Sequence, residues 1–278
     1  MIVYFNQQFI PKTQVKIDPD DRGFLFADGA YEVIRSYRGK LFKADAHLAR
    51  LNRSLGFLRI DLPEEVNFRE IGCRLLEQNN LQEEDANVYI QVTRGSAQRK
   101  HAFPDEDIPA TLYASVSSFE RPVKKQELGV KVILVPDNRW TRCDIKSISL
   151  LANVLASQRA KEENAEEAIF VRDDVALEGS HSSFCGVFNN CLTTAPKSNY
   201  ILPGITREVV LQLCREIDIT VDESPISVNR LKEADELMLL STSLEITPVV
   251  QVDDWKAGDG KPGAVTRKLQ QAFEKLIT

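Results

Sequence analysis

Apolar and polar residues alternate along the first 119 residues with two different periods. Leu48, Leu51, Leu55 and Leu58 recur at the spacing that places them on one face of a helix, which Asp45 can cap. Val88, Ile90 and Val92 instead alternate with polar residues, which is typical of a half-buried strand. The pattern predicts strands at 1–9, 88–92 and 111–119, a mixed apolar run at 30–37, and helices at 45–58 and about 64–78.

The rest of the chain mixes the same two periods after a polar, proline-containing segment at 120–126 (ERPVKKQ), where we place a domain boundary. Ser147 can cap a helix that turns Leu150, Leu151, Val154 and Leu155 inward. Further elements are predicted as strands at 130–136, 168–172, 183–188, 191–194 and 236–240 and helices at 203–217 and 265–276. The irregular alternation favours a mixed α/β (α+β) protein with domains at 1–119 and 127–278.

Composition and charge narrow the function. The 278 residues are 43% hydrophobic and 27% charged, which is typical of an ordered globular chain, and the net charge of −6 argues against nucleic-acid binding. The longest apolar runs fall far short of the ~20 residues that span a membrane, and residues 1–12 show no secretory signal. Five cysteines without CxxC spacing indicate reduced thiols in a cytoplasm, and His47, His101 and His181 lack metal-binding spacing.

Lys146, in the segment RCDIKS, is a candidate nucleophile. It lies between Ile145 and the predicted apolar helix, where an apolar wall and a helix N-terminus disfavour the ammonium form. A neutral amine can attack a carbonyl and form a Schiff base. Taken alone, the position fits an ordinary solvated lysine better, because most lysines are exposed.

Three further segments offer partners for an anionic, nitrogen-containing ring. After Pro203-Gly204, Ile205 and Thr206 would present the free N–H groups of a first helical turn, a favourable phosphate site. Glu178 leaves an apolar run, and a buried carboxylate there needs a cationic partner such as a protonated pyridine. Residues 241–243 (STS) could cradle an anion or simply end a strand, Glu178 could be a hairpin-end glutamate in water, and Thr206 could simply lie near the cap of an ordinary helix start. Together with Lys146, these groups match the needs of pyridoxal 5'-phosphate.

Six segments, in this order, resemble the class IV (fold-type IV) aminotransferases over nearly the whole chain: FADGAYEVIRSYRGKLFKADAHLARL, QVTRGSAQRKHAFP, RWTRCDIKSISLLANVLASQRA, EAIFVRDDVALEGSHSSFCGVF, YILPGITREVV and STSLEITPV. Within this family, the chain is most similar to the D-amino-acid aminotransferases. The resemblance implies a small N-terminal α/β domain and a larger C-terminal pseudo-barrel domain. It also implies a homodimer whose active sites are shared across the interface.

The resemblance also implies roles for individual residues. Lys146 would hold the cofactor as a Schiff base and act as the catalytic base and acid, and Glu178 would pair with the ring nitrogen. Arg50, Ile205, Thr206 and Thr242 would bind the phosphate, and Leu202 would pack on the ring. Tyr31 with Arg99 and His101, the last two from the neighbouring subunit, would bind the substrate carboxylate. The expected reaction moves an amino group from a D-amino acid, such as D-alanine or D-glutamate, to 2-oxoglutarate or pyruvate.

Two positions depart from the family pattern. Where D-amino-acid aminotransferases commonly read EGSSSNVFG, this chain has His181 for a serine and Ser183 for the asparagine. Other reactions on the same scaffold are a branched-chain L-amino-acid or (R)-amine aminotransferase and an aminodeoxychorismate lyase, and a non-catalytic binding protein is a further alternative. Arg99 and His101 argue against the branched-chain and (R)-amine alternatives.

Overall fold

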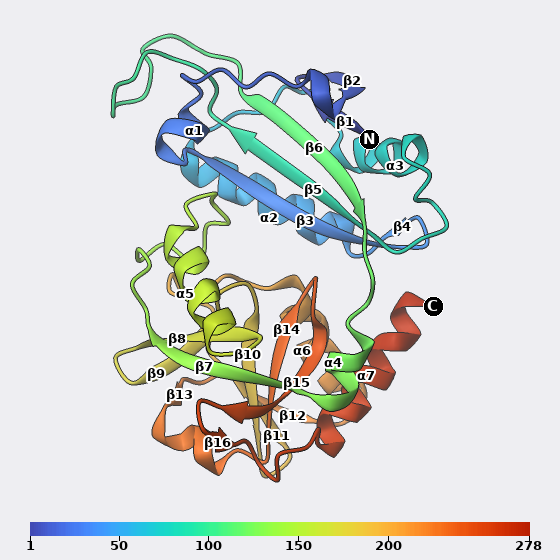
Figure 1. Ribbon diagram of the computed structural model, residues 1–278, viewed down its shortest axis with the longest axis vertical. Coiled ribbons are helices and arrows are strands. Elements are labelled where there is room, and N and C mark those ends of the chain that lie inside the picture. Colours follow the sequence, from blue (N-terminus) through green and yellow to red (C-terminus); the bar gives the residue numbers. More distant parts are fainter. The chain divides into compact units, whose positions relative to one another are not determined.

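The computed structural model in Figure 1 describes all 278 residues, which divide into two compact units. The first unit contains Met1–Glu120 together with Ile145–Leu150, and the second contains Arg121–Asp144 together with Leu151–Thr278. None of the helices is both long and apolar enough to cross a membrane. Helices and strands occur in both units, so the mixed α/β class expected from the sequence is confirmed.

The first unit is built on one six-stranded sheet with the order β2-β1-β6-β5-β3-β4, in which every neighbouring pair is antiparallel. The strand predicted at 1–9 is a hairpin, because Asn6 and Gln7 adopt positive φ angles and turn the chain. The elements of this unit are β1 (Ile2–Phe5), β2 (Gln8–Pro11), a 3-10 helix (Lys12–Gln14), α1 (Arg22–Phe26), β3 (Gly29–Tyr37), β4 (Lys40–Leu41), α2 (Ala44–Leu58), α3 (Phe68–Gln78), β5 (Ala86–Thr93) and β6 (Thr111–Ser118).

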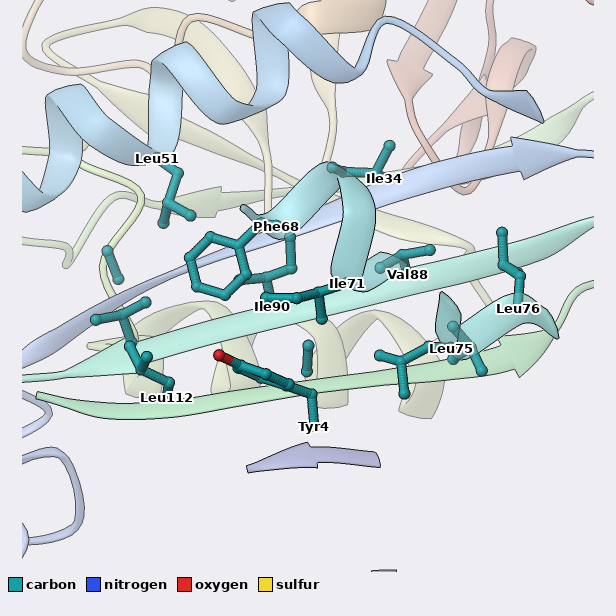
Figure 2. Packing of buried hydrophobic residues seen from close by; sticks show 14 of the residues in the cluster. Tyr4, Ile34, Leu51, Phe68, Ile71, Leu75, Leu76, Val88, Ile90 and Leu112 are labelled. Atoms are coloured by element: carbon teal, nitrogen blue, oxygen red, sulfur yellow. The ribbon is translucent and has the colours of Figure 1, made fainter. Parts of the chain in front are cut away.

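The core of this unit lies between the sheet and the helices α2 and α3 (Figure 2). Leu51 of α2 and Phe68 and Ile71 of α3 pack over Ile34 of β3 and Ile90 of β5. The residue that precedes α2 is not the cap expected from the sequence. Lys43 precedes α2 and Asp45 lies in its first turn, while α3 begins after Asn67, whose side chain accepts a hydrogen bond from Glu70 N–H.

The segment 145–150 leaves the second unit and packs with the first. The N–H of Lys146 donates to Ser54 Oγ at 3.1 Å, and its carbonyl accepts from Tyr31 N–H at 3.0 Å. Ser147 forms a β-bridge with Ala30. The helix predicted from Ser147 therefore begins only at Leu151, because these bridging bonds hold residues 146–147 extended beside β3. The sequence had placed this segment in the later domain.

The second unit contains a sheet that closes on itself. β10 pairs with β14, and the pairing continues through β15, β7, β8 and β9 back to β10, where Glu178 faces Ser183. The elements are α4 (Val123–Leu128), β7 (Val130–Pro136), α5 (Leu151–Glu162), β8 (Glu167–Arg172), β9 (Val175–Gly179), β10 (Ser183–Phe188), β11 (Cys191–Thr194), α6 (Ile205–Glu216), β12 (Thr220–Asp222), β13 (Ile226–Ser227), a 3-10 helix (Asn229–Glu233), β14 (Glu236–Ser241), β15 (Glu245–Val252), β16 (Trp255–Lys256) and α7 (Ala264–Ile277).

Helix α5 faces the sheet with the opposite side from the one expected. Ala156 and Ala160 are buried against β7 and β8, whereas Leu151, Val154 and Leu155 are 73%, 58% and 63% exposed. The prediction that these three side chains turn inward was wrong. Small alanines allow α5 to lie close to the sheet, and the larger apolar residues form a stripe on the outer face of the helix.

Candidate functional site

Helix α2 and strand β3 of the first unit hold a buried group of three charged or polar side chains. Arg50 donates from Nε to Glu32 Oε1 at 2.6 Å and from Nη2 to Glu32 Oε2 at 2.9 Å. His47 Nδ1 lies 2.8 Å from Glu32 Oε2. Glu32 points to the helix-covered face because strand residues alternate, and Ala30 and Ile34 on the same face belong to the core. One turn of α2 then brings His47 and Arg50 to the same carboxylate.

The electrostatics of this group fix its charges. Burial disfavours the Glu32 carboxylate, but Arg50 and His47 outweigh burial and lower the pKa of Glu32 to about 2. Burial lowers the pKa of His47, in spite of the neighbouring carboxylate. Glu32 is therefore an anion and His47 is neutral near pH 7. Arg50 is held from the side by a bidentate bond, which fixes the direction of its guanidinium.

Lys146 lies in the same unit, beside Tyr31. The Nζ atom is 4.2 Å from the centroid of the Tyr31 ring, and the Lys146 backbone is bonded at both its N–H and its carbonyl. Those backbone bonds, rather than a helix N-terminus, position the amine. The structure thus brings Lys146 to Tyr31, while Arg50 is bonded to Glu32 on the helix-covered face of β3, opposite the face that carries Tyr31.

Arg99 and His101 lie on the exposed loop between β5 and β6, which projects beyond α1 in Figure 1. Both side chains contact the ring of Phe26: the His101 ring meets it edge to face at 5.6 Å, and the Arg99 guanidinium lies 5.2 Å from its centroid. The arginine and histidine predicted to bind a carboxylate therefore lie close to one aromatic side chain of their own chain.

In the second unit, Glu178 occupies the end of β9 and is buried. Arg139 Nη1 donates to Glu178 Oε1 at 2.5 Å, and the N–H of Leu202 donates to both carboxylate oxygens at 3.2 and 3.0 Å. Burial raises the pKa of Glu178 to about 7, although Arg139 and the Leu202 N–H act in the opposite direction. Near pH 7 this carboxyl group is thus divided between its charged and neutral forms, and a further cation beside it would favour the charged form.

The N-terminus of α6 follows Leu202 by three residues. The helix begins at Ile205, no side chain caps it, and Thr206 is buried in its first turn. A Cβ on Gly204 would lie 2.5 Å from Ser183 Oγ, so a larger residue here would displace the Ser183 hydroxyl of β10. Thr242 lies in the turn between β14 and β15, where Ser241 Oγ accepts from Leu244 N–H at 3.0 Å. Unit two therefore holds Glu178, Leu202, Ile205, Thr206 and Thr242.

Comparison with known proteins decides the family. The family model for amino-transferase class IV matches residues 29–252, which include every strand from β3 to β15. The chain belongs to the class IV aminotransferases.

Several curated relatives of this aminotransferase share one name. It is 42% identical over 276 residues to the D-alanine aminotransferase of Staphylococcus haemolyticus, covering 99% of this chain and 97% of the relative. It is 40% identical over 278 residues to the D-alanine aminotransferase of Bacillus licheniformis, covering 100% of this chain and 97% of the relative.

Solved structures confirm the fold of this aminotransferase. The branched-chain amino acid aminotransferase of Escherichia coli superimposes with a TM-score of 0.91 at 24% identity, covering 100% of this chain and 94% of that one. The branched-chain aminotransferase of Thermoproteus uzoniensis gives 0.86 at 22% identity, with 100% and 95% covered. The fold-type IV architecture expected from the sequence is confirmed.

The sequence did not single out several side chains that organise the site of this aminotransferase. Glu32, His47 and Arg139 were missed as partners of Arg50 and Glu178. The sequence did contain one signal for the partnership of His47 with Arg50, because the two residues are three positions apart on one predicted helix. Arg139 gave none: it is held by Asp137, with Nε to Oδ1 at 2.9 Å, and is brought to Glu178 only by the packing of β7 beside β8 and β9.

The unusual His181 of this aminotransferase pairs with a carboxylate that the sequence also missed. Glu167 is fully buried on β8, and its oxygens accept from Ser180 N–H and Oγ at 2.9 and 2.5 Å and from Ser182 Oγ at 2.9 Å. His181 Nδ1 lies 2.9 Å from Glu167 Oε2. Glu167 thus fixes the turn at 180–182 that follows Glu178, and His181 adds an ion pair to it.

This pair predicts a pH dependence of stability. Burial of the imidazole acts to lower the pKa of His181, but Glu167 outweighs burial and raises this pKa above 6.5. Burial likewise acts to raise the pKa of Glu167, but His181, Ser180 and Ser182 outweigh it and lower this pKa below 4.5. The contribution of His181 to the free energy of unfolding is complete below pH 6.5 and is lost as pH rises through the raised pKa of His181. The contribution of Glu167 is lost as pH falls through its lowered pKa. Wild type should exceed His181→Ser in unfolding free energy by up to about 1 kcal/mol near pH 5.5, because the imidazole is part-exposed, and by less at pH 9.

Urea unfolding of both proteins at several pH values between 5 and 9 measures this difference. An unchanged difference across that range would show that the ion pair contributes nothing to stability.

Proposed function

We propose that this aminotransferase is a pyridoxal-phosphate-dependent D-amino-acid transaminase, which moves an amino group from D-alanine, D-glutamate or a similar D-amino acid to 2-oxoglutarate or pyruvate. The observation that carries this proposal is the 40–42% identity to D-alanine aminotransferases over nearly the full chain. The positions of Lys146 and Glu178 and the exposed Arg99–His101 loop support it.

The residues of the second unit fit the proposed cofactor. A buried carboxyl group with a pKa of about 7 is stabilised as an anion by a protonated ring nitrogen, and Glu178 is such a group. An uncapped helix N-terminus with a buried threonine suits a phosphate dianion, which Ile205 and Thr206 provide. Thr242 would add a hydroxyl to the phosphate, and Leu202 would pack on the ring.

The first unit would supply the reactive amine and one cation. We assign Lys146 Nζ as the atom that holds the cofactor aldehyde, because its backbone is tied to Ser54 and Tyr31 and only the side chain remains to move. Arg50 would bind the phosphate with its guanidinium directed by Glu32. His47, neutral and bonded to the same carboxylate, adds no competing charge.

When bound, pyridoxal phosphate supplies an aldehyde that accepts the amino group and a ring that accepts electrons. The chain's own residues do the remaining work. Lys146 Nζ, once released, takes the proton from the substrate Cα and returns it, acting as base and then as acid. Glu178 keeps the ring nitrogen protonated, with Arg139 and the Leu202 N–H holding the carboxylate in place. Two half-reactions of this kind predict ping-pong kinetics.

The substrate carboxylate would be bound by Tyr31, Arg99 and His101. A phenol, a guanidinium and an imidazole can each donate a hydrogen bond to a carboxylate oxygen. Arg99 and His101 are both exposed on their loop, so their side chains are free to enter the active site of a second copy of the chain. A carboxylate held at this point orders the other groups at Cα, so the same residues would select the D enantiomer.

We infer that the working form is a homodimer, and the outer stripe of α5 supports this. Leu151, Val154 and Leu155 present an apolar surface that a soluble monomer would leave in water. Leu155→Asp should raise the dimer dissociation constant by roughly two orders of magnitude, because an unpaired charge would be buried. Sedimentation measures this, with Ser157→Asp, an exposed position near the inner side of α5, as control. Dimers of unchanged stability in Leu155→Asp would place the interface elsewhere.

We also propose a reducing, cytoplasmic location. All five cysteines are free thiols, and Cys143, Cys185 and Cys214 are buried, where oxidation to a disulfide would require the fold to open.

The test of the proposed function compares enantiomers. The purified enzyme with pyridoxal phosphate, D-alanine and 2-oxoglutarate should form pyruvate, detected through lactate dehydrogenase. L-alanine in the same assay, and L-leucine with the consumption of 2-oxoglutarate followed by chromatography because its product is not pyruvate, should give kcat/KM values at least about 100-fold lower, which corresponds to loss of the carboxylate contacts. A preference for L-leucine would instead assign a branched-chain activity, and pyruvate formed from aminodeoxychorismate without any 2-oxo acid acceptor would assign a lyase.

A further inference from the structure

We propose that helix α1, through Arg22 and Phe26, positions the Arg99–His101 loop and thereby sets the affinity for the substrate carboxylate. This inference rests on the proposed function, in which that loop binds the carboxylate. Arg22 and Phe26 would act through Arg99 and His101 and are therefore positioning residues, with no contact to the substrate themselves.

The guanidinium of Arg22 bonds the backbone of the loop at three successive residues. Its Nη1 donates to the carbonyl of Lys100 at 2.7 Å and to that of Ala102 at 3.3 Å, and its Nη2 donates to the carbonyl of His101 at 3.3 Å. The planar fork of an arginine suits such a set of acceptors, whereas a lysine ammonium cannot span them in one plane. The backbone between Arg99 and Phe103 is thus held by α1, while the side chains of Arg99, Lys100 and His101 stay exposed.

Phe26, one turn further along α1, supports the two side chains themselves. Its ring meets the His101 ring edge to face, with the Arg99 guanidinium 5.2 Å from its centroid. The Arg22 guanidinium lies 4.9 Å from the same ring. One aromatic side chain therefore contacts the histidine, the arginine and the guanidinium that holds the loop backbone.

Arg22 is itself rigidly placed. It is buried, and its Nε donates to Asp28 Oδ2 at 2.8 Å. Asp28 also accepts from Arg94 Nε and Nη2 at 2.7 and 3.0 Å, and these two arginines outweigh burial and lower the pKa of Asp28. The Arg22 N–H donates to the carbonyl of Gly95 at 2.9 Å, close to the start of the loop. A buried, paired guanidinium directed at the carbonyls of an exposed loop fixes the loop's direction.

The test uses the holoenzyme and the substitution Arg22→Lys. Lysine keeps the charge that Asp28 requires but loses most of the bonds to the loop, so the KM for D-alanine and for D-glutamate should rise about tenfold or more. The kcat should stay within roughly a factor of three, and the visible absorbance of the bound cofactor should not change, because no group at the cofactor is altered. Phe26→Leu should raise KM in the same way and provides a second variant should Arg22→Lys fold poorly.

A second readout does not depend on activity. Trypsin cleavage after Arg99 or Lys100, followed by mass spectrometry, should be at least several-fold faster in Arg22→Lys than in the wild type, because a loosened loop enters a protease more readily. Arg74→Lys is the matched control: its guanidinium also stacks on a phenylalanine, Phe9, at 4.1 Å, but it contacts no part of the loop. It should leave both KM and the cleavage rate unchanged.

Arg99→Ala separates this inference from the proposed function. An unchanged KM in Arg99→Ala would remove the carboxylate trap itself, and this inference would fall with it. If Arg99→Ala raises KM while Arg22→Lys and Phe26→Leu keep wild-type KM and cleavage rates, the trap stands and the positioning role of α1 is refuted.

Discussion

Replacement of Lys146 by alanine should lower kcat by about 10⁴-fold or more, since in the proposed mechanism the amine both holds the cofactor and moves the Cα proton. The substitution removes only the side chain beyond Cβ. The backbone bonds to Ser54 and Tyr31 do not depend on that side chain and should persist, so the segment 145–150 should keep its place. Steady-state kinetics with D-alanine and 2-oxoglutarate provide the measurement.

Lys161→Ala is the control for this substitution, since Lys161 is exposed on α5 and lies outside the site. It should retain wild-type activity. Turnover of Lys146→Ala within tenfold of the wild type would show that another group performs the proton transfer.

Substitution of Glu178 by glutamine should have the second largest effect, with a loss of about 10² to 10³ in kcat. Glutamine keeps the size of the side chain but cannot keep a ring nitrogen protonated, so electrons would no longer be drawn into the ring. The loss should appear in kcat more than in the KM for D-alanine, because the proposed partner of Glu178 is the cofactor ring rather than the substrate carboxylate. Stopped-flow measurement of one half-reaction isolates this step.

Glu178→Asp tests whether the charge or the length of the side chain matters. It retains a carboxylate next to Arg139 and should recover part of the lost rate. Equal rates for Glu178→Gln and the wild type would contradict the pairing with the ring nitrogen.

Local periodicity predicted most of the elements correctly. Strand β7 at Val130–Pro136 and strand β10 at Ser183–Phe188 lie where the apolar runs placed them. Helix α4 was missed because residues 123–128 follow a proline and carry two lysines and one glutamate, which do not distinguish a short surface helix from a linker. Strand β15 was also missed, since Pro248 and three polar residues interrupt its apolar positions.

Helix α5 shows what periodicity leaves open. The spacing of Leu151, Val154 and Leu155 correctly indicated one apolar face, but spacing does not state what covers that face. The alanines on the opposite side pack on β7 and β8, and the leucine face remains exposed in the single chain.

The site was predictable only where residue type carried chemistry. Lys146, Glu178 and the 203–207 segment stood out because an amine, a carboxylate and a helix start suit one cofactor. Arg22 did not, because its role depends on carbonyls 78 to 80 residues away. Glu167 and Arg139 were missed for the same reason: a pairing across strands is set by sheet register, which a single sequence does not reveal.

Borohydride reduction of the holoenzyme, followed by tryptic mapping, tests the central claim most directly. The account predicts a pyridoxyl group on Lys146, which would block cleavage there and leave one peptide spanning residues 143–159 with the label inside it. Treatment with D-alanine before reduction should remove that label by converting the cofactor to its aminated form. A label on any other lysine, or no label at all, would contradict the account.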